Sequence, residues 1–233
     1  TFSLNENSDF YADDIKFNSL GHPAFTCYHE GKELCRLQLD VPGEHNILNA
    51  LVSIACTYTL GIDLDTIVDT LEHYSGTQRR FDIVGKTKNG MQIIDDYAHH
   101  PTEIKATLKA AQNIPHNNIW CIFQPHTYTR TIALFDEFTN AFDDADKVIF
   151  AKIFPAREKN IYKISSKQLM TGLKKVHPDK EAYYFEDFED IARFAYDNAE
   201  PGDLIMTVGA GDVYKIGEMI LDIDKKADTG ENE

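Results

Sequence analysis

The chain has 233 residues, 42% of them hydrophobic, and its aromatic content of 11% is too high for a disordered protein. A formal net charge of −15 argues against binding DNA or RNA, because that affinity needs a basic surface that neutralises phosphates. No apolar run approaches the roughly 20 residues that span a bilayer, and no N-terminal segment resembles a signal peptide. We therefore expect a cytoplasmic globular protein that binds neither nucleic acid nor membranes.

The first part of the chain changes from a strand pattern to a helix pattern. Apolar and polar residues alternate over 24–29 and 37–41, which predicts antiparallel strands joined by a turn at Glu30-Gly31-Lys32. Helical spacing follows over 44–60 and again over 64–74. Residues 75–78, Ser-Gly-Thr-Gln, have the composition of a linker. The two predicted domains are an α+β piece, residues 1–77, and a Rossmann-like α/β piece, residues 78–233.

The second predicted domain alternates strands with helices. Buried strands are predicted for the apolar runs 91–94, 119–123, 148–151 and 204–208. Helices are predicted from Pro101 onward and over about 131–145, 166–176, 188–199 and 213–222. This alternation indicates a mostly parallel sheet, in which right-handed crossovers bring the carboxyl ends of the strands to one edge.

Polar groups follow each of the four predicted strands, and open α/β sheets bind their ligands at this edge. The richest group is Asp95-Asp96-Tyr97-Ala98-His99-His100-Pro101-Thr102-Glu103, after the first strand. The residues expected to lie along the edge are His99, His126, Arg130, Arg157 and Asp212. Arg79, Arg80 and Arg130 provide positive charge that could hold a small anion.

Two glycine-containing segments resemble nucleotide-binding motifs, but each lacks residues that its motif requires. Gly85-Lys86-Thr87 looks like the end of a phosphate-binding loop, but Arg80 stands where that motif needs its first glycine. We instead predict a strand and a hairpin turn through Asn89-Gly90. Gly209-Ala210-Gly211 is half of a dinucleotide fingerprint and lacks the rest, which disfavours a dehydrogenase.

The cysteines and histidines do not predict a metal site. Cys27, Cys35, Cys56 and Cys121 show no Cys-x-x-Cys spacing, and we expect buried free thiols. His99, His100 and His126 have no nearby cysteine and no helical His-x-x-x-His pair, so no metal is expected.

Four segments together resemble the Mur ligases, and the resemblance covers nearly the whole chain. They are Gly43 to Ala50, Arg79-Arg80-Phe81, Asp95 to Glu103 and Phe123 to Arg130. These ATP-dependent enzymes form amide bonds in the peptide stem of peptidoglycan and have three domains. The resemblance implies that residues 1–77 are the truncated end of the central ATP-binding domain and residues 78–233 the complete C-terminal domain. ATP and Mg²⁺ would serve the full-length enzyme, whose phosphate-binding loop, magnesium ligands and uridine-nucleotide domain would lie outside this chain.

The resemblance also assigns nucleotide-binding roles. Asn46 and Asn49, one helical turn apart, would present their amides toward adenine or ribose, and His45 would frame the same pocket. From the residues alone, a cluster capping the helix N-terminus is an open alternative. Arg80 would reach ATP, where the alternative is a surface ion pair, and Asp96 would accept a hydrogen bond from the ribose.

Tyr97, His99, His126 and Arg130 resemble the catalytic groups that receive the muramoyl carboxylate and the incoming amino acid. Within the family the motifs are most similar to those of the members that join L-alanine to UDP-N-acetylmuramate through an acyl phosphate. Thr127 stands where those members often have arginine. A ligase that recycles a ready-made tripeptide and a non-catalytic binding module of the same fold are the alternatives. The isolated chain is expected to be inactive and to bind no nucleotide tightly.

Overall fold

The computed structural model describes residues 1–229 and divides the chain into two compact units. The first contains residues 1–77 together with 109–115, and the second contains residues 78–108 and the chain from 116 onward. Each unit is described by itself below, and residues 230–233 of the second predicted domain lie outside the described residues. No helix within residues 1–229 is both long and apolar enough to cross a bilayer.

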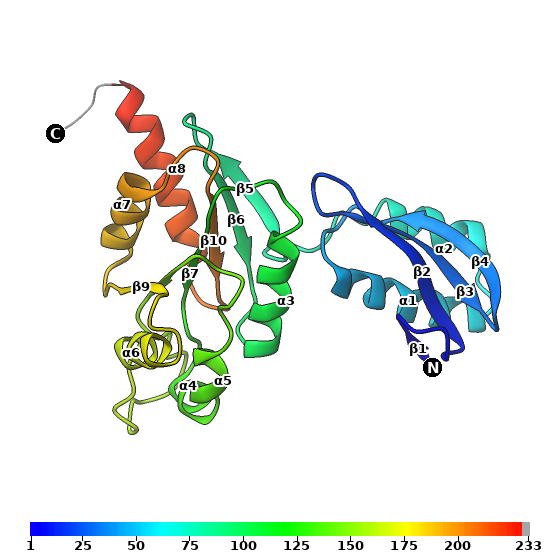
Figure 1. The fold of residues 1–233 in the computed structure, drawn as a ribbon, viewed down its shortest axis with the longest axis horizontal. Coiled ribbons are helices and arrows are strands. Elements are labelled where there is room, and N and C mark those ends of the chain that lie inside the picture. Colours follow the sequence, from blue (N-terminus) through cyan, green and yellow to red (C-terminus); the bar gives the residue numbers. More distant parts are fainter. Residues whose placement is uncertain (230–233) are drawn as a thin grey trace. The chain divides into compact units, whose positions relative to one another are not determined.

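The first unit is a four-stranded sheet with two helices (Figure 1). The elements are β1 (Phe2–Ser3), β2 (Phe10–Phe17), β3 (Pro23–His29), β4 (Lys32–Gln38), α1 (Glu44–Thr59) and α2 (Leu64–Glu72). The strands are antiparallel in the order β1-β2-β3-β4, except that β1 runs parallel to β2. The predicted hairpin is confirmed: Glu30 and Gly31 both have positive φ angles, 49° and 75°, as a tight two-residue hairpin turn requires.

One stripe of α1 closes the core of this unit. Ile47, Ala50, Leu51 and Ile54 follow helical spacing and are buried against core residues of the sheet such as Phe25. Ile54 is fully buried. A residue two positions further along the helix lies about 200° around its axis and therefore points away from this core.

Cys56 therefore lies off the buried stripe of α1, and its thiol is exposed. The prediction that all four cysteines are buried is wrong for this residue. Cys35 is half-buried, and Cys27 and Cys121 are buried as predicted.

The second unit is a six-stranded sheet in the order β5-β6-β10-β7-β8-β9. Its strands are β5 (Asp82–Lys86), β6 (Gln92–Asp96), β7 (Ile119–Phe123), β8 (Lys147–Phe150), β9 (Glu181–Tyr184) and β10 (Leu204–Val208). All neighbours are parallel except the β5–β6 hairpin, which confirms the predicted mostly parallel sheet and the turn near Asn89-Gly90. The carboxyl ends of β6, β10, β7 and β8 therefore share one edge. The short edge strand β9 was not predicted.

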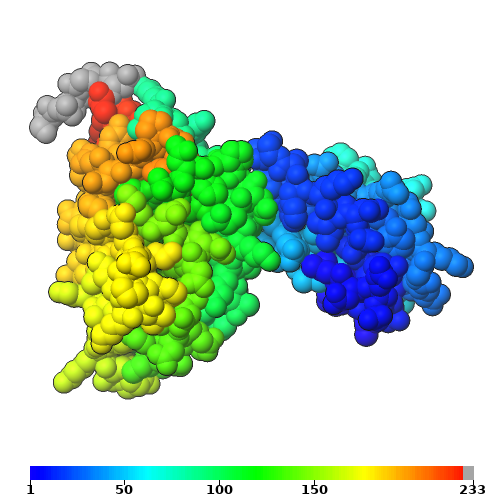
Figure 2. Space-filling view, in the orientation of Figure 1, coloured from blue at the N-terminus to red at the C-terminus, as the bar shows by residue number. Residues whose placement is uncertain are grey.

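Helices cover both faces of this sheet (Figure 1). They are α3 (Pro101–Ala111), α4 (Tyr128–Ala133), α5 (Phe135–Thr139), α6 (Ser166–Val176), α7 (Phe188–Asn198) and α8 (Tyr214–Thr229). Alternate strand residues divide between the faces: Trp120 and Ile122 of β7 join the core under α7 and α8, whereas Phe123 packs against Phe138 of α5. In the space-filling view the α4–α5 region and α6, green to yellow, form one continuous surface (Figure 2).

The single helix predicted over 131–145 is wrong in its extent. Leu134, at φ −111° and ψ 25°, separates α4 from α5. The chain then leaves the helix after Thr139, because the side chains of Thr139 and Asn140 both donate hydrogen bonds to the Asp136 carbonyl oxygen. The helical spacing of apolar residues continues beyond this point. For that reason the sequence pattern overestimates the length of the helix.

Candidate active site

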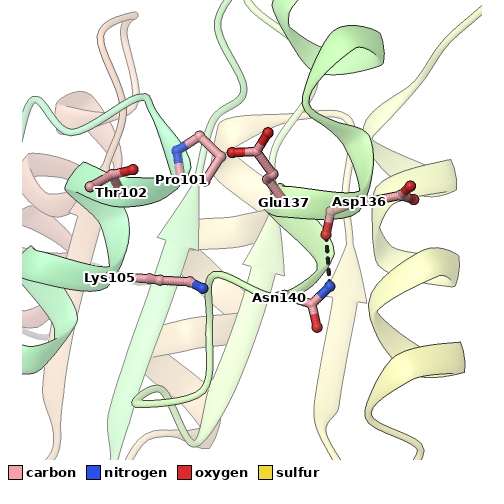
Figure 3. Close-up of a pocket in the computed structure, with 6 residues that line it drawn as sticks. All are labelled: Pro101, Thr102, Lys105, Asp136, Glu137 and Asn140. Atoms are coloured by element: carbon pink, nitrogen blue, oxygen red, sulfur yellow. Dashed lines mark hydrogen bonds between the residues drawn. The ribbon is translucent and has the colours of Figure 1, made fainter.

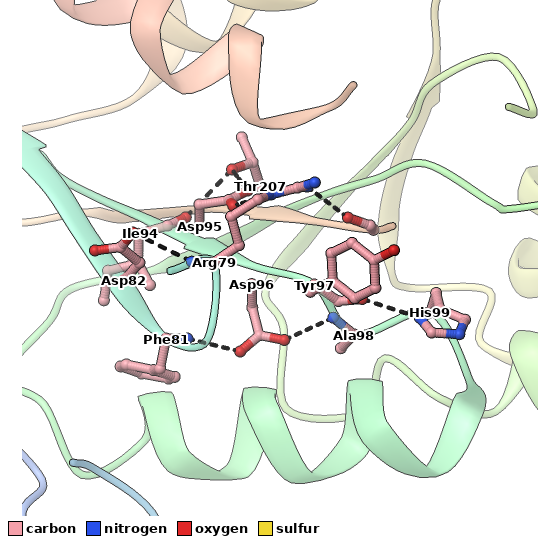
Figure 4. Close-up of polar contacts among 11 residues, drawn as sticks. Arg79, Phe81, Asp82, Ile94, Asp95, Asp96, Tyr97, Ala98, His99 and Thr207 are labelled. Atoms are coloured by element: carbon pink, nitrogen blue, oxygen red, sulfur yellow. Dashed lines mark hydrogen bonds and ion pairs between the residues drawn. The ribbon is translucent and has the colours of Figure 1, made fainter. Parts of the chain in front are cut away.

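A buried ion pair fixes the carboxyl end of β6. Arg79 Nε donates to Asp95 Oδ2 at 2.8 Å, and Thr207 Oγ1 of β10 donates to Asp95 Oδ1 at 2.7 Å. Arg79 also donates through Nη2 to the Gly209 carbonyl oxygen at 2.8 Å. Its guanidinium thus links the ends of two neighbouring strands (Figure 4). Arg79 was predicted to hold a small anion, and the structure instead gives it the Asp95 carboxylate.

Asp96 shapes the turn that follows. Its side chain is 4% exposed, and its two oxygens accept hydrogen bonds from the backbone N–H groups of Phe81, at 2.8 Å, and Ala98, at 2.7 Å (Figure 4). Burial raises the pKa of Asp96, while these hydrogen bonds and the Arg80 charge oppose the rise. The predicted contact with ribose stays a prediction, and it requires this carboxylate to become accessible.

The turn presents Tyr97 between two arginines and a histidine. The Tyr97 ring lies 5.1 Å from the Arg79 guanidinium carbon and 5.6 Å from that of Arg80, within the range of cation–π attraction. His99 meets the same ring edge-on, with centroids 5.5 Å apart. Arg80 is exposed. The predicted catalytic residue Tyr97 and the predicted ATP contact Arg80 are therefore neighbours.

The N-terminus of α3 holds His99. Glu103 Oε2 accepts hydrogen bonds from the backbone N–H groups of His99, at 2.9 Å, and His100, at 3.2 Å. Burial alone would raise the pKa of Glu103, but these hydrogen bonds and the nearby positive charges lower it. His99 Nδ1 lies 3.0 Å from the Tyr97 carbonyl oxygen. Because a carbonyl oxygen only accepts, Nδ1 carries the proton, and Nε2 of the neutral ring is a free acceptor.

His126 and Arg130 lie at the end of β7 and on α4. Arg130 Nη1 is 3.3 Å from His126 Nδ1, and the His126 ring stacks on Phe154 with centroids 5.4 Å apart. Burial, followed by the positive charge of Arg130, lowers the pKa of His126, and His99 adds to this effect when it is protonated. A guanidinium only donates, so Nδ1 accepts and the proton of the neutral ring is on Nε2. The rings of His126 and His99 are 6.0 Å apart between centroids.

His99, His126 and Arg130 are named the histidine–arginine cluster. The cluster combines donors for an anion, Arg130 and the Nε2–H group of His126, with an acceptor for an amine, Nε2 of His99. A planar guanidinium is well suited to a carboxylate or a phosphate. The structure thus brings together all four residues predicted to be catalytic, since Tyr97 contacts His99.

Glu158 is a residue of this region that motif analysis did not single out. Its carboxylate accepts hydrogen bonds from the backbone N–H, at 2.9 Å, and the hydroxyl of Thr129, in the first turn of α4. The Thr129 hydroxyl is the main cause that lowers the pKa of Glu158. The Glu158 charge in turn opposes the lowering of the His126 pKa. Only its place in the loop after β8 could have drawn attention to it.

The predicted nucleotide contacts His45, Asn46 and Asn49 lie on α1 in the first unit. Asn46 Nδ2 donates to the Pro42 carbonyl oxygen at 2.8 Å, and Asn49 Nδ2 donates to Asn46 Oδ1 at 2.9 Å. Neither side chain caps α1, whose N-cap is Gly43. The two amides are ordered as one hydrogen-bonded pair, and Asn49 is exposed. Their roles toward a nucleotide stay predictions.

Three further features of the second unit are a cavity and the predicted edge residues Asp212 and Arg157. A cavity of about 360 Å³ between α3 and α5 contains none of the predicted site residues (Figure 3). It is lined by Pro101, Thr102, Lys105, Asp136, Glu137 and Asn140. Asp212 pairs with Lys215 at 3.5 Å, and Arg157 is exposed in the loop after β8. Among residues 1–229, no group of three His, Cys, Asp or Glu side chains could hold a metal ion.

Known proteins are similar to this chain in sequence and in fold. The family described as "Mur ligase, glutamate ligase domain" matches residues 79–211, more than half of the chain. The UDP-N-acetylmuramate–L-alanine ligase of Acetivibrio thermocellus is 51% identical over 222 residues, and that of Clostridium acetobutylicum is 49% identical over 216 residues. These matches cover 95% and 93% of this chain but 47% and 46% of the relatives.

A solved structure agrees with the sequence relatives. The crystal structure of the UDP-N-acetylmuramate–alanine ligase of Thermotoga maritima superposes with a TM-score of 0.79 at 28% identity, covering 97% of this chain and 48% of that one. The chain belongs to the Mur ligase family. It spans about half the length of the curated relatives that it matches.

Proposed function

We propose that this chain is part of an ADP-forming ligase that uses ATP to join L-alanine to the carboxylate of UDP-N-acetylmuramate in the cytoplasm, a step in peptidoglycan precursor synthesis. Support comes from relatives of that activity at 49–51% identity. The observation that carries the proposal is the geometry of the histidine–arginine cluster, in which Arg130 Nη1 lies 3.3 Å from His126 Nδ1 and the two histidine rings are 6.0 Å apart. The domain assignment follows: residues 1–77 would complete an ATP-binding domain, and residues 78–233 would form the amino-acid-binding domain.

The histidine–arginine cluster matches the two ends of a free amino acid. Arg130 and the Nε2–H group of His126 would donate to the alanine carboxylate. His99 Nε2 would accept a hydrogen bond from the alanine amine and orient its lone pair toward the carbonyl carbon that it attacks. The lowered pKa of His126 keeps this ring neutral near pH 7, so that its Nδ1 keeps accepting from Arg130.

ATP would supply the phosphoryl group that converts the muramoyl carboxylate into an acyl phosphate. Arg80 fits a role toward the phosphates, because its guanidinium is exposed and is positioned beside Tyr97. Asn46 and Asn49 fit a role toward adenine or ribose, since their ordered amides offer both donors and acceptors. The described residues offer no cluster of metal ligands, so Mg²⁺ would be held by the rest of the full-length protein.

Phosphate release by the full-length protein tests this proposal. With ATP, Mg²⁺ and UDP-N-acetylmuramate present, we expect L-alanine to stimulate release and the tripeptide not to do so. Turnover with the tripeptide alone would establish the recycling ligase instead. No turnover with either, but saturable ligand binding, would support the non-catalytic binding module.

A further inference from the structure

The two cysteines of the β3–β4 hairpin, Cys27 and Cys35, face each other across the strands. They are register partners in the antiparallel pair, so both side chains point to the same face of the sheet. Cys27 is fully buried in the core of the first unit, and Cys35 is half-buried and packs against that core. Both are free thiols.

The hydrogen-bond pattern of the hairpin gives the spacing of this pair. Leu39 N donates to the Pro23 carbonyl oxygen at 2.9 Å, so Pro23 and Leu39 form a hydrogen-bonded pair. Hydrogen-bonded and non-hydrogen-bonded pairs alternate along an antiparallel ladder. Counting two residues at a time through Phe25–Leu37 makes Cys27–Cys35 the last hydrogen-bonded pair before the register shifts between Cys27 and Tyr28.

Such pairs have Cα atoms about 5.5 Å apart. Disulfides need a Cα separation of about 4.4–6.8 Å, most often 5.5–6 Å. The native register therefore already holds the two cysteines at bonding distance, and no strand has to shift.

We propose that Cys27 and Cys35 are a redox-active pair that forms a reversible disulfide within the folded protein. The partner oxidant is a low-molecular-weight disulfide such as oxidised glutathione. The bond would cross-link the hairpin directly beneath α1, the helix that carries Asn46 and Asn49.

The two thiols differ in pKa and in accessibility, as a two-step thiol–disulfide exchange requires. The Cys27 thiol donates a hydrogen bond to the Tyr28 carbonyl oxygen at 3.9 Å, and the interaction between the two cysteine side chains raises the pKa of Cys27 and lowers the pKa of Cys35. Burial adds to the rise for Cys27; for Cys35, burial and the nearby Glu33 and Glu72 carboxylates oppose the lowering. Cys35 is thus both the more accessible sulfur and the one that more readily becomes a thiolate.

The exchange balances in two steps. The Cys35 thiolate attacks one sulfur of oxidised glutathione, forming a mixed disulfide and releasing one glutathione thiolate. Cys27 then loses its proton and attacks the Cys35 sulfur, which forms the Cys27–Cys35 bond and releases the second glutathione. Two electrons pass from the cysteines to glutathione, and the two cysteine protons end on its two thiols.

The test uses the whole chain carrying Cys56→Ser, which removes the exposed thiol that could cross-link two molecules. Cys121, buried in the second unit, serves as an internal control. After incubation with oxidised glutathione, free thiols are alkylated and the protein is analysed by intact mass and peptide mapping. We expect a monomer that has lost two hydrogens, a Cys27–Cys35 cross-linked peptide, an alkylatable Cys121 after unfolding, and full reversal by dithiothreitol.

Two further variants and a melting curve complete the experiment. Adding Cys27→Ser should stop the reaction at the glutathione adduct of Cys35, and adding Cys35→Ser should abolish the cross-link. The oxidised chain should unfold at a temperature several degrees higher than the reduced chain, because the bond constrains the unfolded state. A folded chain whose two thiols stay reduced, whose Cys35 keeps glutathione without a cross-link, or whose oxidised form melts lower would overturn the proposal.

Discussion

Replacing Arg79 by alanine tests whether the buried ion pair builds the end of β6. The substitution removes the 2.8 Å contact with Asp95 and the hydrogen bond to the Gly209 carbonyl oxygen. It leaves Asp95, whose side chain is 3% exposed, as a buried carboxylate with only the Thr207 hydroxyl as a hydrogen-bond partner. We expect a large loss of stability, because an uncompensated buried charge is costly.

The size of the expected stability loss follows from how deeply the two side chains are buried. Removing one partner of a fully buried pair costs about 3–5 kcal/mol. The Arg79 side chain is 24% exposed, which lets water reach the vacated space, so we expect a loss near the lower limit, about 3 kcal/mol. For a unit of about 150 residues this corresponds to a melting temperature lower by about 6–12 °C.

Urea unfolding of four proteins would measure this effect: wild type, Arg79→Ala, Asp95→Asn and the double variant. Asparagine removes the charge and keeps the acceptor for Thr207, so the double variant should be more stable than Arg79→Ala alone. Arg193→Ala, at an exposed position of α7, is the matched control and should change stability by less than about 0.5 kcal/mol. A loss below about 1 kcal/mol for Arg79→Ala, or no recovery in the double variant, would refute the reasoning.

Other predictions concern His126 and one glycine. Arg130→Met should raise the pKa of His126 and Glu158→Gln should lower it, because the two charges act on this pKa in opposite directions. NMR titration of the His126 ring in each variant and in wild type measures the pKa. The same pKa in all three proteins would contradict the prediction. The folded state lowers the His126 pKa below 6.5, so the unfolded chain binds the proton first and stability should fall as the pH drops through 6.5 toward the folded value. Urea unfolding at a series of pH values should show a weaker fall for His126→Asn, and an unchanged fall would contradict the assignment. Gly209→Ala should cost about 2 kcal/mol or more, because φ is +150° and a Cβ would lie 2.7 Å from the Gln124 carbonyl oxygen. Gly31→Ala, at φ +75° with no atom within 4 Å of a Cβ, is its control and should cost about 1 kcal/mol in the same denaturation assay; equal losses would count against the steric argument.

The parallel sheet and its polar edge could be predicted because they depend on local patterns. Buried strands are continuous apolar runs, and each crossover brings a strand end such as His99 or His126 to the same edge. The break at Leu134 could not be predicted, because the bonds from Thr139 and Asn140 that end α5 compete with a pattern that continues beyond them.

Long-range partners are the part of the site that sequence alone does not reveal. Arg79 meets Asp95 and Gly209, which are 16 and 130 positions away, and Glu158 meets Thr129, 29 positions away. No local sequence pattern identifies these pairs of partners. Their positioning roles depend on the order of the strands in the sheet, in which β10 lies between β6 and β7.

The apparent KM for L-alanine in the full-length ligase carrying Arg130→Met tests the proposed amino-acid site most directly. Losing one charge-assisted contact, worth about 1.5–3 kcal/mol, should raise this KM by about 10- to 150-fold. The KM for ATP should stay within about twofold, and Arg193→Met, the matched control on α7, should change neither. An unchanged KM for L-alanine in the Arg130 variant would contradict the account.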